Sequence, residues 1–84
     1  MKKLPRVEFD PDADVLYVHL ADGEVDETLS LGDLRNIDRS KDGTVLGVEF
    51  VSASHGVDLS DIPFARKIAA AIGDSGFPVQ VLAA

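Results

Sequence analysis

The chain has 84 residues, no cysteine, two histidines and a formal net charge of -7 at neutral pH. A chain of this length can bury one modest hydrophobic core, so we expect residues 1–84 to form a single domain. Without cysteine the chain cannot form disulfides, zinc–thiolate sites, iron–sulfur clusters or a thiol nucleophile, and two histidines disfavour a histidine-rich metal site.

Acidic residues are concentrated in the first half of the chain. Residues 7–34 contain nine Asp and Glu residues and no Lys or Arg. Proteins bind nucleic acids through cations that displace phosphate counterions, so this half disfavours nucleic acid as a partner. No apolar run reaches the roughly 20 residues of a membrane span, and a strand pattern follows Met1–Arg6 in place of the apolar stretch of a signal peptide. We therefore expect a cytoplasmic protein that makes no membrane contact.

The first two predicted strands form a hairpin. Residues 6–9 alternate charged and apolar side chains, and residues 15–20 are rich in β-branched and aromatic types. Residues 10–14 lie between them and consist of turn-forming types: proline cannot donate to a sheet, and Asp side chains bond to the backbone two residues on. In the second strand, Tyr17 and His19 fall on the face opposite Leu16 and Val18.

Three further strands are predicted. Residues 24–31 alternate, with Glu27 on the apolar side near an edge, and residues 34–39 give a weaker pattern. The turn at Asp42-Gly43 precedes residues 44–51, the most apolar strand, in which Gly47 marks a bulge or a close approach. The short connections leave no room for crossover helices, so we predict an antiparallel β-meander of about five strands.

One C-terminal helix is expected to cover one face of the sheet, which makes the fold class α+β. Apolar residues at helical spacing predict this helix from Ser60 or Asp61 to Ile72, about residues 61–72; they are Ile62, Ala65, Ile68, Ala69 and Ile72. Ser60 or Asp61 would cap it, Pro63 would lie in its first turn, and Gly73 or Gly76 would end it. Residues 77–82 predict a short last strand, paired within the chain or with another subunit.

Three alternating carboxylates suggest a calcium loop. Asp10, Asp12 and Asp14 match the first three oxygen positions of an EF-hand. The position that requires glycine holds Val15, and the position that requires a bidentate glutamate holds Ala21. We therefore favour a turn and expect neither a metal nor a cofactor.

Two groups of residues suggest catalysis. His19 with a neighbouring carboxylate has the ingredients of a general acid–base pair, although a half-exposed surface histidine is the favoured interpretation. Residues 52–61 contain serines, His55 and aspartates, but no serine lies in a Gly-x-Ser-x-Gly elbow. We therefore assign no catalytic residue.

The stretches FDPDADVLYVHLADGEVDET and DGTVLGVEFVSAS share a pattern with a known family. The pattern is an aromatic residue before Asp10-Pro11, a Leu16-Tyr17 strand and an Asp-Gly turn before Val45-x-Gly47. Residues 7–54 thereby resemble the small bacterial family of domains of unknown function numbered twenty-two eighty-three (DUF2283). The resemblance implies a mostly β domain without an assigned reaction, and some members resemble the antitoxin half of toxin–antitoxin pairs. The charged residues 34–39 replace the family's longer apolar fourth strand.

The leading hypothesis is a non-enzymatic interaction module that uses the acidic half and an unpaired sheet edge, as a homodimer or with a basic protein partner. The candidate partner-binding residues are Asp12, Asp14, Tyr17, His19, Asp26 and Glu27. The alternative is a small enzyme or ligand-binding domain with a site around Tyr17 and His19. A concave pocket that brings His19 within hydrogen-bond reach of a carboxylate would favour that alternative. A self-assembling structural domain would instead show a large apolar interface.

Overall fold

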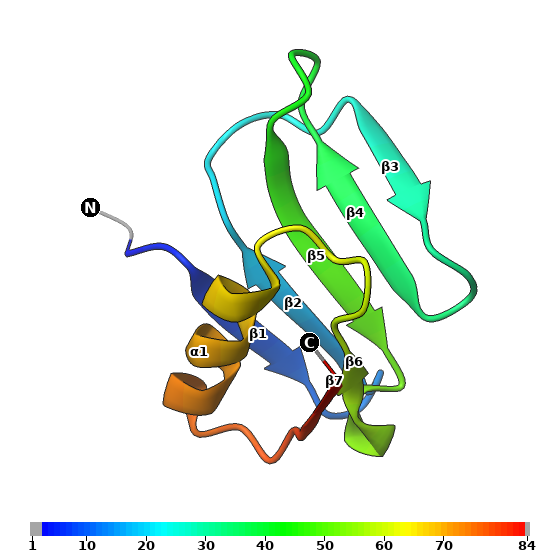
Figure 1. Cartoon of the computed structure of the whole chain (residues 1–84), viewed down its shortest axis with the longest axis vertical. Helices are drawn as coiled ribbons and strands as arrows, with labels where there is room; N and C mark the ends of the chain where they lie inside the picture. The colour runs from blue at the N-terminus through cyan, green and yellow to red at the C-terminus, as the bar shows by residue number, and fades with distance from the viewer. Residues whose placement is uncertain (1–2, 84) are drawn as a thin grey trace.

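The computed structural model describes residues 3–83 and contains a five-stranded antiparallel sheet with one α-helix near the C-terminus (Figure 1). The strands are β1 (Arg6–Asp10), β2 (Val15–His19), β3 (Glu27–Ser30), β4 (Arg35–Arg39) and β5 (Val45–Val51). The helix is α1 (Ala65–Ser75), and the shorter elements are η1 (Ala53–His55), β6 (Val57–Asp58) and β7 (Val81–Ala83). The predicted α+β class and the sheet of five antiparallel strands are confirmed.

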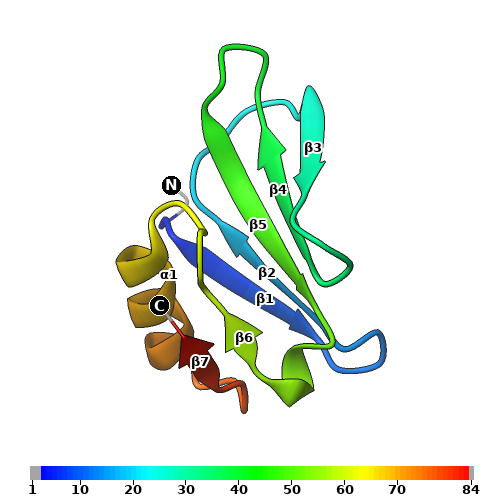
Figure 2. The ribbon, with the colours of Figure 1, turned by 45° about the vertical axis from the view of Figure 1, so that its right-hand side comes forward.

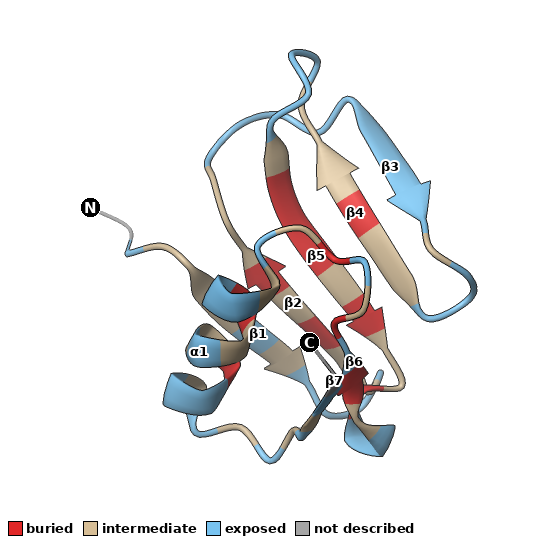
Figure 3. Ribbon diagram, viewed as in Figure 1, coloured by how far each residue is buried: buried red, intermediate tan, exposed pale blue. Residues whose placement is uncertain are grey.

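The strand order differs from the predicted meander. It runs β1-β2-β5-β4-β3, so β5 lies between β2 and β4, and the connection after β2 passes to the far edge before β3 begins (Figure 1). The N–H groups of Leu20 and Ala21 donate to Leu46 O, at 2.8 and 3.2 Å, which anchors the start of this connection on β5. β5 is the most apolar strand, so it buries the most apolar surface when a strand lies on each side of it. The fully exposed β3 lies at an edge of the sheet (Figure 3).

The strand register aligns apolar side chains in rows on one face of the sheet. One row contains Val7, Val18, Val48, Ile37 and Leu29, and the next contains Phe9, Leu16 and Phe50. Exposure is 0% at Val18 and Val48, 6% at Ile37 and 38% at Leu29. The layer that covers this face therefore ends before β3.

The covering layer is shared between the helix and the segment that precedes it (Figure 2). Ile68 and Ile72 of α1 enter the core together with Ala53, Val57, Leu59 and Ile62. β6 and β7 pair in parallel at the side of α1, so the last strand is Val81–Ala83, shorter than the predicted 77–82 and paired within the chain. No helix among residues 3–83 is long and apolar enough to cross a membrane.

The helix begins later than predicted, at Ala65 instead of Ser60 or Asp61. Hydrogen bonds to other parts of the chain hold Ser60 outside the helix. The Arg35 guanidinium donates to Ser60 O at 2.6 Å, and Ser60 N–H and Oγ donate to Asp58 Oδ1. Asp61 and Phe64 then have left-handed φ values of 61° and 60°, so the chain turns twice before it becomes helical. Gly76, with φ 79°, directly follows the last helical residue. It is one of the two glycines predicted to end the helix, and the other, Gly73, lies inside the helix.

Candidate functional site

Within residues 3–83, no element covers the face of the sheet opposite α1 (Figure 2). The side chains on this face are mostly polar. The register places Arg6, His19, Gly47, Asp38 and Thr28 in one row across the five strands, and Glu8, Tyr17, Glu49, Asn36 and Ser30 in the next. We call this surface the open face. Its side chains pair with one another, which leaves a polar surface held in a fixed arrangement.

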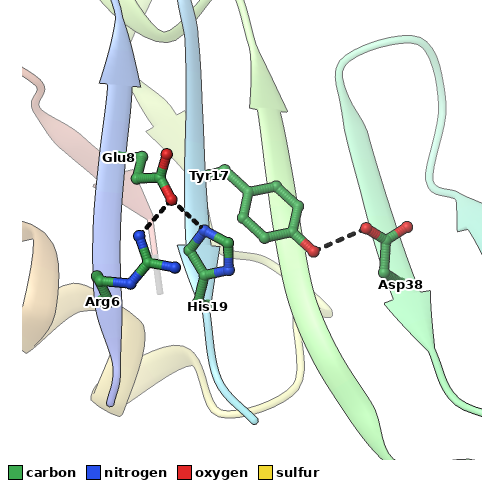
Figure 4. Close-up of polar contacts among 5 residues, drawn as sticks. All are labelled: Arg6, Glu8, Tyr17, His19 and Asp38. Carbon is green, nitrogen blue, oxygen red and sulfur yellow. Dashed lines mark hydrogen bonds and ion pairs between the residues drawn. The ribbon is translucent and has the colours of Figure 1, made fainter. Parts of the chain in front are cut away.

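Glu8 joins the first two strands at one side of the open face. His19 Nε2 lies 2.6 Å from Glu8 Oε1, and the Arg6 guanidinium donates to the same oxygen (Figure 4). Because a carboxylate only accepts, the His19 proton is on Nε2 in this arrangement. The hydrogen bonds from Arg6 and His19 hold the pKa of Glu8 below its ordinary value, so Glu8 is ionised at neutral pH.

Tyr17 extends across the neighbouring strand β5 to reach β4 (Figure 4). Its hydroxyl donates to Asp38 Oδ2 at 2.7 Å, and Thr28 Oγ1 donates to Asp38 Oδ1 at 2.6 Å. The ring lies directly over Gly47, where a Cβ atom would stand 2.5 Å from Tyr17 Cζ. The close approach predicted at Gly47 is therefore explained by the tyrosine ring.

The hydroxyl of Tyr17 remains protonated far above neutral pH. Burial of the phenol raises its pKa, and the hydrogen bond to Asp38 raises it further. Tyr17 is consequently a neutral hydrogen-bond donor that fixes Asp38, and the geometry gives it no role as a base.

The Tyr17 and His19 rings connect the two polar clusters. They meet edge to face with centroids 4.5 Å apart. Beside them is a shallow hollow of about 260 Å³, whose wall includes Arg6, Asp22 and Val25. The pocket and carboxylate contact that would favour a ligand-binding site are thus both present, although the hollow is slightly smaller than the ~300–1,000 Å³ of typical small-molecule sites.

The turn after β1 uses its carboxylates within the chain. Asp10 Oδ1 accepts the N–H groups of Asp12 and Ala13 at 3.0 and 3.2 Å, as the turn interpretation predicted. Asp14 accepts the backbone N–H of Ser54 at 2.8 Å and the Ser54 hydroxyl at 2.6 Å. These bonds lower the pKa of Asp14 and tie the turn to η1. Within residues 3–83, no three His, Asp or Glu side chains are arranged to hold a metal.

The six candidate partner-binding residues lie in three separate places. Tyr17 and His19 are on β2, the second strand of the open face, Asp12 and Asp14 are in the first turn, and Asp26 and Glu27 are at the β3 edge. The Arg39 guanidinium donates to Glu27, while Asp26 is exposed.

Sequence reasoning missed Arg6, Glu8 and Asp38 as members of the open-face cluster. Glu8 is recoverable from the hairpin alone, since the register pairs it with Tyr17. Asp38 is not, because its approach to Tyr17 depends on β5 lying between their strands.

Comparison with protein families identifies a match over most of the sheet-forming part of the chain. The family model described as "Protein of unknown function (DUF2283)" matches residues 6–54. This range contains all five strands of the sheet and the open-face cluster, and it ends before α1. No curated protein and no solved structure matches the chain. Because the matched residues exceed half of the chain and confirm the resemblance found in its motifs, the protein belongs to the DUF2283 family.

Proposed function

We propose that this protein is a non-enzymatic interaction module that binds a basic protein partner at β3 and on the adjoining open face. The observation that carries the proposal is the exposure of β3. All four of its residues are exposed, and no strand lies beyond it in the described sheet. An edge strand presents unpaired backbone N–H and C=O groups, to which a strand of another chain can add.

β3 is short, with four residues, but it lacks two residue types with which proteins commonly block edge pairing. It contains no proline and no lysine, and its one charged side chain, Glu27, is paired with Arg39. Leu29 of this strand is 38% exposed, and Val25, in the connection before the strand, is 50% exposed. A strand added here would bury Leu29 and continue the apolar row of the covered face.

The charges around β3 favour a basic partner. Asp22, Glu24 and Asp26 precede the strand and Asp33 follows it; all four are exposed, and none forms an ion pair within residues 3–83. Their field attracts cationic surfaces and raises the association rate. A homodimer through this edge would place two acidic surfaces together, so a basic protein is the favoured partner. The family resemblance implies that such binding serves an antitoxin-like role.

Tyr17 and His19 supply the second part of the proposed interface. Tyrosine combines a large apolar ring with a polar tip and is common at protein interfaces. Asp14 contributes by holding the first turn, since its carboxylate is already bonded to Ser54. Asp12, in the same turn, is exposed, and we place it at the periphery of the proposed interface.

The test is affinity capture from the cell that makes the protein. We expect recovery of a basic protein in a stoichiometric complex, and loss of that protein from the double variant Asp26→Lys with Glu27→Lys. The matched control is Asp61→Lys with Asp74→Lys, which changes the net charge equally on the layer that contains α1. Recovery of no stoichiometric partner, or equal weakening by the control, would contradict the proposal.

A second candidate function is binding of a small ligand beside His19. The observation that favours it is the 2.6 Å contact between His19 Nε2 and Glu8 next to the hollow of about 260 Å³. NMR spectra of the purified chain with a library of small polar compounds test this candidate without any partner protein. Shifts that are confined to His19, Arg6 and Asp22 and are abolished by His19→Gln would support this candidate function. If no compound of the library causes such shifts, the candidate function is excluded.

A further inference from the structure

A larger groove lies on the other layer of the molecule, between α1 and the residues that lead into β1. Its volume is about 460 Å³, which falls within the ~300–1,000 Å³ of typical small-molecule sites. One apolar wall consists of Leu4, Pro5 and Val7, and the other consists of Ala70, Ala71 and Phe77. Figure 1 shows α1 beside β1 and away from β3, so this groove is separate from the proposed protein interface.

The groove results from small side chains on one side of the helix. α1 directs Ile68 and Ile72 into the core, while Ala70 and Ala71 face the N-terminal residues and are too short to fill the space. The far end is fixed by Phe77, whose ring packs against Phe9 of β1 with centroids 5.7 Å apart. Its apolar walls are therefore formed without a ligand.

The charges at the groove are opposite in sign to those of the whole protein. Lys3 and Lys67 lie on its two walls, and Asp74 is its single acidic lining residue. Neither lysine forms an ion pair within the described part of the chain. In a protein with net charge -7, this groove is thus a local site where an anion is attracted.

We propose that the groove binds an aliphatic carboxylate, with its hydrocarbon chain along Ala70 and Ala71 and its carboxylate between Lys3 and Lys67. The apolar walls require an apolar body, and the two ammonium groups require an anionic head. The lysine stems extend the apolar surface while their charged ends stay near solvent. Asp74 repels the head group and so directs it toward Lys67, which lies about two helical turns away.

Titration of the full chain with decanoate, followed by amide NMR shifts, tests this site. We expect saturable shifts at Val7, Ala70 and Ala71, and weaker binding of the uncharged analogue decanol. Lys67→Gln should weaken decanoate binding roughly three- to fivefold, and Asp74→Asn should strengthen it by a similar factor. The control Lys41→Gln removes the same charge from the exposed β4–β5 turn and should leave binding unchanged.

A blocking variant gives an independent readout. Ala70 is exposed, so Ala70→Trp can fill the groove without entering the core, and it should abolish the shifts while the melting temperature stays near that of the parent. The proposal is overturned by absence of saturable shifts, by equal binding of decanol, or by equal weakening from Lys41→Gln. It is also overturned if the shifts appear instead at Leu20 and Val45, which line a neighbouring hollow of about 290 Å³.

Discussion

On the covered face of the sheet, Leu16, Val18 and Val48 are fully shielded from solvent, whereas their neighbours on the open face, Tyr17 and Glu49, are only half-buried. The two faces alternate along the same strands but are stabilised differently. Apolar burial contributes in proportion to area and needs no particular partner. Polar pairs each contribute about 1 kcal/mol and depend on one partner in one place.

This difference indicates where the molecule can change without unfolding. The covered face holds most of the folding free energy, so substitutions there should act on stability first. The open face holds directional contacts among Glu8, His19, Tyr17 and Asp38, so substitutions there should alter the surface more than the fold. Four substitutions, in order of decreasing effect, test this division.

The largest effect is expected for Phe50→Ala on the covered face. Phe50 is 2% exposed in the central strand, and truncation of a buried phenylalanine costs about 3–5 kcal/mol. At roughly 0.05–0.15 kcal/mol per residue, a domain of 84 residues has only about 4–13 kcal/mol in total. Urea denaturation should therefore show the loss of a large share of the free energy of unfolding. The control is Glu49→Ala, on the other face of the same strand, which loses one hydrogen bond from Asn36; equal losses would refute the division.

Gly47→Ala should have the next largest effect, although it adds one methyl group on the open face. The new Cβ would meet Tyr17 Cζ at 2.5 Å, so the ring must leave β5 and the hydrogen bond to Asp38 must break. We expect a loss of about 1–3 kcal/mol. In a Tyr17→Ala background the same substitution should be nearly neutral, because the obstructing ring is gone. A cost that persists in that background would show that Gly47 is needed for another reason.

The features that the sequence predicts correctly are local ones. The hairpin at Asp10–Asp14, the face on which Tyr17 and His19 lie and the glycine that ends α1 follow from alternation, turn chemistry and helix capping within a few residues. Tyr17 and His19 could therefore be recognised as site candidates before their surroundings were known.

The features that the sequence does not predict depend on competition between distant segments. The place of β5 between β2 and β4 follows from its greater apolar burial relative to β3, and that placement brings Asp38 to Tyr17. The late start of α1 follows from Arg35, a residue of β4, which bonds to Ser60 O. Helical periodicity over residues 62–72 contains no information about that contact.

Tyr17→Phe should have a smaller effect and should also remove a pH dependence. Loss of the bond to Asp38 is expected to cost about 1 kcal/mol at neutral pH. Because the folded protein raises the pKa of Tyr17 above its ordinary value of 10.0, the folded state holds this proton more tightly than the unfolded state does. This contribution is complete below pH 10 and declines as the pH rises above it.

Denaturation curves at pH 8 and pH 11 give the free energies of unfolding of the parent and of Tyr17→Phe. The difference between the two proteins should be smaller at pH 11 than at pH 8. Tyr17 is the single tyrosine of the chain, so phenolate absorbance reports its ionisation directly. An ordinary midpoint near pH 10 in the folded protein would contradict the hydrogen bond to Asp38.

Glu8→Gln should have the smallest effect, because Glu8 lies at the margin of the open face with its side chain 56% exposed. Exposed ion pairs contribute about 0.2–1 kcal/mol, so we expect a loss of a few tenths of a kcal/mol at pH 7. Arg6 and His19 lower the pKa of folded Glu8 below 4.5, and the stabilisation is therefore present above pH 4.5 and lost as the pH falls further. The free energies of unfolding of parent and variant should differ at pH 7 and become equal by pH 3.

The control Glu24→Gln, in the exposed connection before β3, should leave the free energy of unfolding unchanged at either pH. If the Glu8 difference instead persists unchanged in acid, side-chain packing and not charge connects β1 to β2 on this face, and the open face would resemble the covered face more closely than its polar composition indicates.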